Sequence, residues 1–408
     1  MKRTNVFELI PTKKIDKILQ ELLVRSSAVY NLSNYRKRQT FFQNQKEGSK
    51  KLIPSAYSLQ KELKEMDTYR QLGAGYSQQI IAKNQEAWNS YFQLIKSAKV
   101  KHKVNLPKYY KNRRTNTTLP HILVCRNDLY STSQHYIKIS IPKDLKKKYG
   151  IKQMLKIPYN GVPRWRGKQG KAEIKYDLVK KKYYFFQSVT IPDPVKKSGS
   201  VVGVDLGVRN ALTATTGKKT IKLSTDKLYK KYMTISGRIE RYQSILAQDW
   251  KTKEGKPTRY TSRKICLLFQ KRKRIQAHAM NCYVKDLISF CKQNGVAELA
   301  VGNVKHIRNS VTKSKTVNRM IHNFWSYGIL TQKLRNKCEE AGFSFNLVNE
   351  MYTSQQCPEC THCDKQNRKT QQEFVCTNCS YRNHADIVGA TNILLRHTGG
   401  DTSAVGVS

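Results

Sequence analysis

The spacing of apolar residues changes along the chain, and each change indicates a different kind of structure. In the first hundred residues apolar side chains recur every three or four positions, most clearly between residues 76 and 99, which predicts a helical unit. Between residues 101 and 200, short β-rich runs such as HYIKISI and KKYYFFQSVTI are separated by proline and glycine. This middle region is therefore expected to be mostly β.

After a hinge-like segment at 193–200, apolar runs alternate with longer helical stretches. Strands are expected at 201–206, 210–215, 297–303 and 343–349, and helices around 261–293, around 321–341 and from near Asp386. A chain of 408 residues exceeds what one hydrophobic core usually supports, so we expect two or three domains with the main boundary at 193–200. The last dozen residues, HTGGDTSAVGVS, have the composition of a disordered tail.

The charge balance indicates a polyanionic partner. Lysine and arginine number 76 against 28 aspartate and glutamate, which gives a formal charge of +48 and a pI near 10. Such a chain repels itself unless a polyanion shares the charge, so nucleic acid is the expected partner. A membrane is not expected, because no apolar run approaches the ~18 residues of a spanning helix. The opening MKRTNVFELIPTKK lacks the apolar segment of a signal peptide, so we expect a cytoplasmic protein.

Four of the ten cysteines have the spacing of a zinc site. Two CxxC units, separated by fifteen residues, supply Cys357, Cys360, Cys376 and Cys379. This spacing is typical of a ribbon in which four thiolates hold one structural zinc ion, and a reduced cluster without metal is the alternative. His362 and Cys363 lie near enough to serve as alternative ligands. The connecting loop is basic and either stabilises the fold or contacts nucleic acid, through Lys365, Arg368 and Lys369.

Carboxylates are scarce, so the two that end a strand or open a helix need an explanation. Asp205 ends the apolar run VVGV before Gly207, and Asp386 lies at the start of the helical pattern in HADIVGATNIL. A turn aspartate and a helix cap are the simple interpretations. The chemical interpretation is a site for two Mg²⁺ ions about 3.5–4 Å apart, since phosphodiester cleavage of this kind needs carboxylates that converge from distant parts of a chain.

Four stretches of the second half together resemble a known family. In chain order they are GVDLGVRNALT, AVGNVKHIRN, HNFWSYGILTQKLRNKCEEAGFSFNLVNEMYTSQQCPEC and CTNCSYRNHADIVGATNIL. They resemble the TnpB (OrfB) proteins of bacterial insertion sequences, relatives of the type V CRISPR effectors, and the resemblance covers nearly all of 199–395. The first half matches more loosely, through AVYN, AWNSYF and LPKYYK.

The resemblance implies a multidomain α+β fold with an RNase H-like (RuvC) nuclease domain. A zinc ribbon interrupts this domain, and a basic β-barrel (wedge) domain with a helical recognition insert precedes it. The implied limits are 1–12 and 101–198 for the wedge domain, 13–100 for the helical insert, 199–350 and 381–395 for the nuclease domain, 351–380 for the zinc ribbon and 396–408 for a disordered tail. Family members bind an RNA made from the transposon end, which guides the cutting of DNA, while the protein reads a short motif beside the target.

Carried over residue by residue, the resemblance assigns Asp205 and Asp386 as the first and last RuvC acids. The middle glutamate is missing, because Gly302 stands at the end of the second motif's strand. Glu298 lies four positions upstream, more than ~10 Å along an extended strand, which is too far to substitute simply. Glu350 ends the strand expected to lie beside that one and is the predicted replacement. The predicted catalytic, Mg²⁺-binding set is Asp205, Glu350 and Asp386, and the alternative is an inactive site with a solvent-facing Glu350.

Basic and aromatic residues offer candidate contacts to nucleic acid. The candidates that combine both types are Tyr109, Arg113, Arg114, Arg164, Trp165 and Arg166. A second set lies on a predicted helix and comprises Lys271, Arg272, Lys273 and Arg274. Single charge runs are usually solvated surface, and the lysines at 146–148 and 180–182 have that interpretation as well.

The sequence leads to one main functional prediction and two alternatives. The main prediction is a Mg²⁺-dependent, RNA-guided DNA endonuclease, with guide RNA from a transposon end and double-stranded target DNA as partners. The displaced glutamate permits an alternative, a nuclease-inactive RNA-guided repressor. A DNA-strand transposase is disfavoured because no HUH pair or DDE spacing is found. We expect a bacterial protein that is nucleoid-associated when on its target, and monomer and dimer both remain open.

Overall fold

The computed structural model describes residues 1–48, 53–97, 104–112, 115–254, 261–304, 318, 320–370 and 372–399. The chain folds as two compact units, Met1–Pro192 and Asp193–Ser408. The division falls at the segment where the apolar pattern also changes, at 193–200. Each unit has its own hydrophobic core. Over the described residues, no helix combines the length and apolar character needed to cross a membrane.

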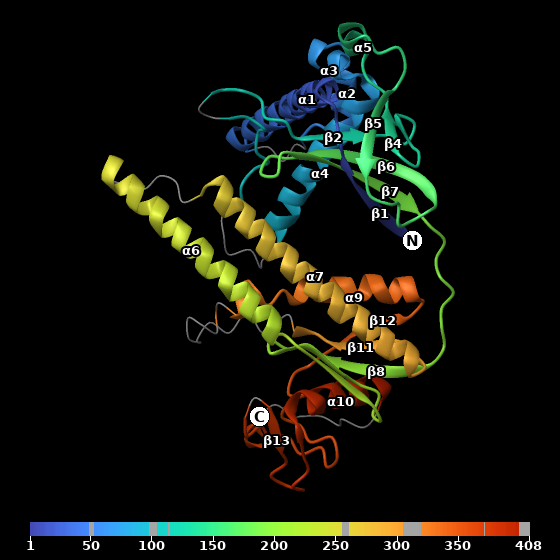
Figure 1. Ribbon diagram of the computed structural model, residues 1–408, viewed down its shortest axis with the longest axis vertical. Helices are drawn as coiled ribbons and strands as arrows, with labels where there is room; N and C mark the ends of the chain where they lie inside the picture. Colours follow the sequence, from blue (N-terminus) through green and yellow to red (C-terminus); the bar gives the residue numbers. More distant parts are fainter. Residues whose placement is uncertain are drawn as a thin grey trace. The chain divides into compact units, whose positions relative to one another are not determined.

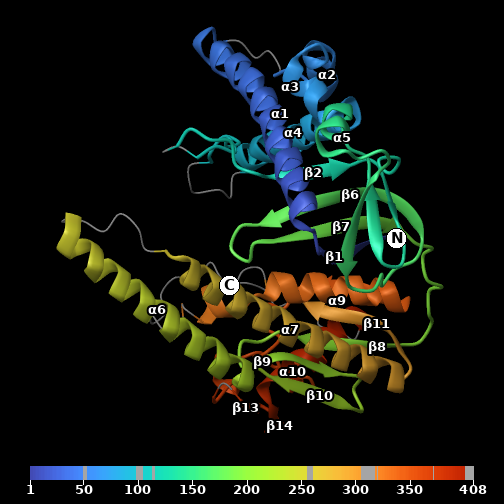
Figure 2. The same ribbon diagram turned by 45° about the horizontal axis from the view of Figure 1, so that its top comes forward.

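Helices occupy the first part of the first unit (Figure 2). They are α1 (Lys13–Lys46), α2 (Ala56–Leu63), α3 (Asp67–Leu72) and α4 (Ala74–Lys96). The side-chain oxygen of Thr12 accepts the N–H of Ile15 at 3.3 Å and so satisfies one of the donors that a helix start leaves unpaired. The apolar face of α1 buries Leu19, Leu22 and Leu23 completely in the core of this unit.

A seven-stranded antiparallel sheet and the short helix α5 (Lys143–Tyr149) form the rest of the first unit. Its strands are β1 (Lys2–Leu9), β2 (Ile122–Cys125), β3 (Tyr130–Thr132), β4 (Tyr136–Ile139), β5 (Leu155–Asn160), β6 (Lys168–Asp177) and β7 (Lys182–Thr190). Their order in space is β2-β6-β7-β1-β5-β4-β3. The first strand, β1, pairs with both β7 and β5, so the start of the chain lies in the middle of the sheet.

This sheet is open, which corrects the expectation of a closed β-barrel. A barrel closes only when every strand has a neighbour on both sides. The edge strands β2 and β3 are only four and three residues long, and in the part of the chain that the structure describes they do not pair with each other. A register shift between Gln169 and Ala172 marks an irregularity in β6, of the kind that bends a strand, but the two edges still do not meet.

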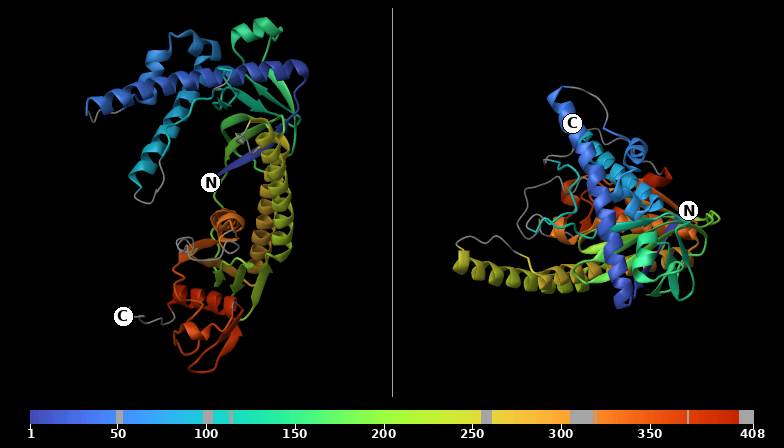
Figure 3. Two further views of the ribbon diagram at one scale, coloured as in Figure 1. Left: turned by 90° about the vertical axis from the view of Figure 1, so that its left-hand side faces the viewer. Right: turned by 90° about the horizontal axis from the view of Figure 1, so that it is seen from above.

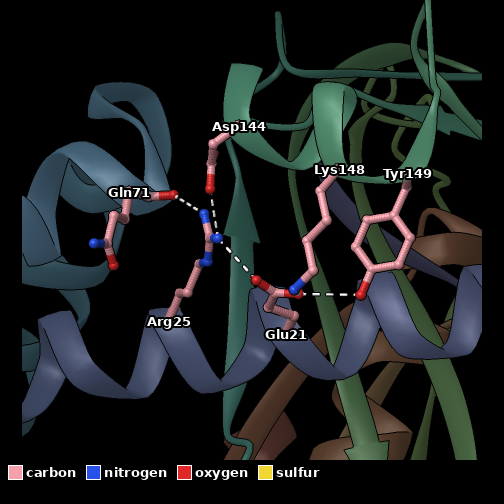
Figure 4. Close-up of polar contacts among 6 residues, drawn as sticks. All are labelled: Glu21, Arg25, Gln71, Asp144, Lys148 and Tyr149. Carbon is pink, nitrogen blue, oxygen red and sulfur yellow. Dashed lines mark hydrogen bonds and ion pairs between the residues drawn. The ribbon is translucent and has the colours of Figure 1, made fainter.

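A polar network fastens α5 to α1 and to the end of α3 (Figure 4). The guanidinium of Arg25 donates to the carbonyl of Gln71 at 2.5 Å, to Asp144 at 2.5 Å and to Glu21 at 2.8 Å. Lys148 completes the network by donating to the second carboxylate oxygen of Glu21 at 2.8 Å. One lysine of the 146–148 run is therefore engaged within the protein, because it neutralises a partly buried acid.

The second unit is built on a five-stranded mixed sheet of order β10-β9-β8-β11-β12. Its strands are β8 (Ser200–Asp205), β9 (Asn210–Thr215), β10 (Thr220–Ser224), β11 (Val296–Gly302) and β12 (Ser344–Val348). The strands β8, β11 and β12 are parallel, so their carboxyl ends lie on one edge of the sheet, whereas β9 runs antiparallel to its neighbours β8 and β10. This edge carries the ends of both strands that the sequence analysis expected to hold acidic residues.

Helices cover both faces of this sheet (Figure 1). They are α6 (Asp226–Glu254), α7 (Arg263–Gln293), the five-residue π-helical turn η2 (Met320–Phe324), α9 (Tyr327–Ala341) and α10 (Ala385–Thr398). Successive residues of β8 alternate between the faces: Val202 and Val204 enter the core with α7 and α9, whereas Gly203 meets α10. The long helices α6 and α7 run side by side (Figure 3) and bury a small cluster of isoleucines between them.

Candidate active site

Two glycines let α10 approach the central strand β8 closely. A Cβ atom on Gly203 would lie 2.2 Å from the carbonyl oxygen of Ala390, and one on Gly389 would lie 3.3 Å from the carboxyl carbon of Asp205. Any larger residue at position 203 would push the helix away. The close approach places the first turn of α10, which carries Asp386, at the end of the strand that carries Asp205.

Asp205, Glu350 and Asp386 line one cavity of about 450 Å³. The side chain of Asn210 also lines it and donates to Asp386 Oδ2 at 2.7 Å, which orients that carboxylate. His384 is the N-cap of α10, and its Nδ1 atom accepts the backbone N–H of Asp386 at 3.2 Å. The simple interpretation of Asp386 as the helix cap is therefore wrong, because His384 has that position.

The carboxylate of Glu350 occupies the space beside Gly302. A Cβ atom built on Gly302 would lie 3.0 Å from Glu350 Oε2, which is closer than side-chain contacts normally are. Residue 302 ends β11, and β12, which precedes Glu350, is its parallel neighbour. The acid on the loop after β12 thus reaches the place where a side chain at the end of β11 would lie.

Glu298 has a different environment. Its Oε1 atom accepts a hydrogen bond from Asn346 Nδ2 at 2.6 Å and lies 2.8 Å from Nε2 of His397. These contacts hold β11, β12 and the last turn of α10 together, and Glu298 does not line the cavity that contains the three acids. The glutamate upstream in the motif is therefore a structural residue.

Burial disfavours the charged forms of Asp205 and Glu350, and for Asp205 the nearby carboxylates add to the effect. Burial raises the pKa of Asp205 to about 7, together with the charges of Asp386 and Glu350, while Arg368 opposes the rise. Burial also raises the pKa of Glu350 to about 7. Hard divalent cations such as Mg²⁺ fit this donor set, because they bind carboxylate oxygens and would relieve the repulsion. In the described part of the chain no three acids bring their oxygens within 4.8 Å of one another.

Arg368 and Asn210 also line this cavity and were not among the predicted catalytic residues. Arg368 comes from the basic loop of the cysteine-rich segment and donates to Ser354 Oγ at 2.9 Å. Asn210 opens β9, directly after the turn that follows Asp205. Asn210 lies within the quoted motif GVDLGVRNALT, so its place near the first acid was visible in the sequence, but its contact with Asp386 depends on the packing of α10.

The four cysteines of the two CxxC units form a compact cluster. The ligand atoms of Cys357, Cys360, Cys376 and Cys379 all lie within 4.8 Å of one another. Two sulfur pairs are 3.6 and 3.5 Å apart, close to the ~3.8 Å expected for a tetrahedral ion with 2.3 Å zinc–sulfur bonds. The residues therefore fit a structural zinc ion. Cys363 is not part of the cluster, and His362 Nε2 lies 3.1 Å from the hydroxyl of Thr377 instead.

The cluster is the centre of a small ribbon with the hairpin β13 (Glu373–Val375) and β14 (Arg382–His384). Asn367 is fully buried and joins the two CxxC loops: it accepts the N–H of Thr377 at 2.8 Å and donates to the carbonyl of Gln355 at 2.9 Å. The ribbon's core includes Phe374 and continues into Ala385 of α10. Order in the ribbon is thereby coupled to the helix turn that carries Asp386.

The aromatic candidates for nucleic-acid contact already have cationic partners in the first unit. The guanidinium of Arg38 lies 4.9 Å from the ring centre of Tyr109. Trp165 lies beside two guanidinium groups, those of Arg3 at 5.7 Å and Arg164 at 4.6 Å. Tyr109 and Arg164 are exposed, and Arg166 is exposed as well. The other two predicted residues of this set, Arg113 and Arg114, lie outside the described residues.

The run at 271–274 divides into one packed and three exposed residues. Arg272 lies 4.7 Å from the ring centre of Tyr232 and 5.0 Å from that of Phe269, and it donates to Ser236 Oγ at 2.9 Å. The contacts with Tyr232 and Ser236 join α7 to α6. The exposed members are Lys271, Lys273 and Arg274. The sequence could not show which of the four is packed. Four successive residues cover a full helical turn, so one of them faces the partner helix, but their charges are alike.

Two family models match separate parts of the chain, both of them largely within its second half. Residues 180–308 match OrfB_IS605, described as a probable transposase, and residues 327–393 match the Cas12f1-like TNB domain. The first match includes β8 with Asp205 and β11 with Gly302. The second includes Glu350, the cysteine cluster and Asp386.

Individual relatives extend the similarity over the whole chain. A TnpB-like protein, ORF457 of Acidianus two-tailed virus, is 27% identical over 98% of this chain and 87% of its own. The putative RNA-guided DNA endonuclease InsQ of Escherichia coli is 28% identical over half of each chain. The Cas12f1 endodeoxyribonuclease of Syntrophomonas palmitatica is 26% identical over 52% of this chain and 42% of its own.

Solved structures support the fold. The mini-RNA-guided endonuclease Cas_phi3 matches with a TM-score of 0.53 at 12% identity, over 99% of this chain and 93% of its own. CasPhi-2 (Cas12j) matches with a TM-score of 0.51 at 10% identity, over 100% and 93%. The two family models and the relatives of the TnpB and InsQ type show that the chain is similar to the TnpB (OrfB) proteins and to the Cas12f1 endodeoxyribonucleases.

Proposed function

We propose that this protein is an RNA-guided DNA endonuclease of an insertion sequence. It cuts target DNA beside a short adjacent motif, by hydrolysis at Asp205, Glu350 and Asp386. The relatives include proteins described as RNA-guided or CRISPR-associated DNA endonucleases. The observation that carries the proposal is the 3.0 Å separation between Glu350 Oε2 and the place of a Cβ atom at residue 302, because it returns an acid to the end of β11.

Each side chain of the cavity has a role in this reaction. Asp205 lines the site from the end of β8 and Asp386 from the start of α10, and Glu350 completes the set from the turn after β12. Two bound Mg²⁺ ions would activate the attacking water and neutralise the leaving oxygen. Asn210 keeps one oxygen of Asp386 oriented by its 2.7 Å hydrogen bond. Arg368 supplies positive charge beside Asp205, where the phosphate of a DNA strand would enter.

The proposed partners are a guide RNA from the transposon end and double-stranded target DNA. The net charge of +48 supports a large polyanionic partner, since a free chain of this charge repels itself. Base pairing with the guide would supply most of the sequence specificity, and the protein would read the adjacent motif. The three exposed cations of the 271–274 run are candidates for phosphate contact, and Arg272 is not, because it packs between α6 and α7.

The test begins with the RNA that copurifies with the protein. This RNA is sequenced, and the complex is offered a plasmid library with randomised sequence beside a matching target, in the presence of Mg²⁺. We expect double-strand breaks beside one preferred motif. Motif-dependent binding without cleavage would contradict an endonuclease and support the repressor instead.

The matched variants are Glu350→Gln and Glu298→Gln. Each keeps the shape of the side chain and removes the charge that Mg²⁺ requires. We expect Glu350→Gln to lose cleavage by ~100-fold or more and to keep RNA and DNA binding, and Glu298→Gln to cleave as the parent does. Unaltered cleavage by Glu350→Gln would reject the assigned role.

A further inference from the structure

The acid at residue 350 lies on a turn and not on a strand. The strand β12 ends at Val348, and the chain then turns through Tyr352, whose φ of 62° is in the left-handed region. The carbonyl of Glu350 itself accepts hydrogen bonds from the backbone and hydroxyl of Thr353, at 3.2 and 2.9 Å. A strand end is held by ladder hydrogen bonds on both sides, whereas a turn needs other contacts to stay in place.

One arginine holds the backbone on both sides of Glu350. The Nη1 atom of Arg396 donates to the carbonyl of Asn349 at 3.0 Å and to the carbonyl of Met351 at 2.7 Å. Its Nη2 atom donates to Gln356 Oε1 at 3.1 Å. The guanidinium therefore contacts the residue before Glu350, the residue after it and the end of the same turn.

Asn392, on the same helix as Arg396, also binds the backbone of this turn. Asn392 is 1% exposed, and its Nδ2 atom donates to the carbonyls of Thr353 and Gln356, both at 2.7 Å. Arg396 lies one turn further along α10 than Asn392, and Asp386 lies at the start of this helix. A single rigid element thus carries one acid of the cavity and holds the segment that carries another.

We propose that Arg396 is a positioning residue for Glu350. By holding the carbonyls of Asn349 and Met351, it supplies the rigidity that the acid would have had at the end of β11 and lost on the turn after β12. This inference rests on the proposed function, because it concerns how an acid of the metal site is kept in place. Arg396 itself does not line the cavity, so it acts only through Glu350.

The geometry requires arginine at this position. Three acceptors around one planar group match the fixed fork of a guanidinium, whose N–H groups point in different directions. A lysine would keep the charge and approach one carbonyl, but its single nitrogen cannot hold both flanking carbonyls and Gln356 at once. Arg396→Lys is therefore a mild substitution that removes the fork and preserves the charge.

The experiment compares Arg396→Lys with the control Arg335→Lys in the full-length complex with its guide RNA. Arg335 is an exposed arginine of α9 in the same unit, and its guanidinium lies 5.2 Å from the ring centre of Phe345 in β12. The first readout is independent of DNA cleavage: Fe²⁺ replaces Mg²⁺, added hydrogen peroxide oxidises it to Fe³⁺, and the hydroxyl radical released at the site cuts the polypeptide nearby. The second readout is the Mg²⁺ concentration that gives half-maximal target cleavage.

We expect Arg396→Lys to raise the half-saturating Fe²⁺ and Mg²⁺ concentrations about 10- to 100-fold, the range found when a partner that orients a metal ligand is lost. High Mg²⁺ should restore most of the cleavage rate. Zinc content should stay the same, and Arg335→Lys should match the parent in all readouts. Parent-like metal dependence in Arg396→Lys would overturn the inference, and so would a loss of cleavage that Mg²⁺ does not restore.

A double variant separates this inference from the proposed function. In a Glu350→Gln background, Arg396→Lys should cause no further weakening of Fe²⁺-directed cutting, because the residue it positions has lost its charge. An equal further loss in that background would show that Arg396 acts on something other than Glu350. If Glu350→Gln alone leaves metal dependence unchanged, the proposed catalytic set fails, and the inference about Arg396 fails with it.

Discussion

The substitution Gly302→Ala adds one methyl group at the most sensitive point of the site. Its Cβ atom would lie 2.9 Å from Ile393 Cδ1 and 3.0 Å from Glu350 Oε2, whereas ordinary contacts begin at 3.4 Å. The φ of Gly302 is not in the left-handed region, so the backbone accepts alanine without strain. The only consequence is that the two neighbours must move, and the end of an isoleucine side chain yields easily.

The expected loss of cleavage rate follows from how far the carboxylate of Glu350 must move. Glu350 must retreat by about half an ångström, and a misplacement of ~1 Å in an active site costs up to ~100-fold in rate. We expect cleavage to fall about tenfold at low Mg²⁺ concentration, with the loss partly reversed at high concentration. The fold should lose at most ~1–3 kcal/mol, the usual cost of one extra methyl group in a packed region.

The assay measures plasmid cleavage by the guide-RNA complex across a Mg²⁺ titration, alongside thermal unfolding. Gly328→Ala is the control, because a Cβ atom there would meet nothing within 4 Å. A double variant, Gly302→Glu with Glu350→Ala, returns the acid to the strand and should cleave better than Glu350→Ala alone. If Gly302→Ala cleaves with the same Mg²⁺ dependence as Gly328→Ala, Glu350 does not occupy the place we assign to it.

Three further predictions concern other parts of the molecule. Lys37 is fully buried with its Nζ atom 2.6 Å from Gln85 Oε1, and burial lowers its pKa to about 8. Between pH 8 and 10.5 the unfolded chain binds this proton and the folded chain does not, so stability from this group rises with pH across that window. At pH 7 Lys37→Met should therefore gain up to ~3 kcal/mol of stability from removing the buried charge and lose ~1 kcal/mol with the hydrogen bond to Gln85. Urea unfolding should show this difference from the parent shrinking by pH 10. A difference that does not vary with pH would contradict the prediction. Elemental analysis should find no zinc in Cys376→Ser. Its unfolding temperature should also be lower than that of the parent, because the ribbon core continues into the start of α10. A variant that keeps a full equivalent of zinc would refute the four-thiolate site. Lys273→Ala should reduce the slope of RNA affinity against salt concentration. Arg272→Ala should lower the free energy of unfolding by ~1–2 kcal/mol and leave that slope unchanged. A slope that changes with Arg272→Ala and not with Lys273→Ala would show that the packed arginine is the one that contacts phosphate.

The cluster of four cysteines was the arrangement that the sequence predicted best. Two CxxC units place their sulfurs by local turns, so spacing alone limits the geometry. The choice between the four cysteines and the nearby Cys363 or His362 was still open, and the folded ribbon decided it by placing His362 beside Thr377. Strands and helices of the second unit were also visible as apolar runs and periodic stretches, because their faces bury regular sets of side chains.

The closed barrel was an error of the sequence analysis, and its cause is long-range. Runs with high β-propensity predict strands, but closure depends on whether two edge strands are long enough to pair. Here the edges β2 and β3 have four and three residues. Their lengths are set by where the chain leaves the sheet, which local propensity does not report.

The sequence by itself determined the kinds of chemistry: a strongly basic composition, a cluster of four cysteines and a few acids near the ends of strands and helices. The tertiary structure alone decided which acids meet. Glu350 lies 48 positions from Gly302 along the chain, yet its carboxylate reaches the space beside that glycine because β11 and β12 are parallel neighbours. The hydrogen bonds from Arg396 to the turn around Glu350 could not be predicted from the sequence either. A bond between a helix side chain and a distant backbone carbonyl leaves no local pattern. Propensity and spacing act within a few residues, whereas a metal site needs side chains from several elements, and only packing brings those elements together.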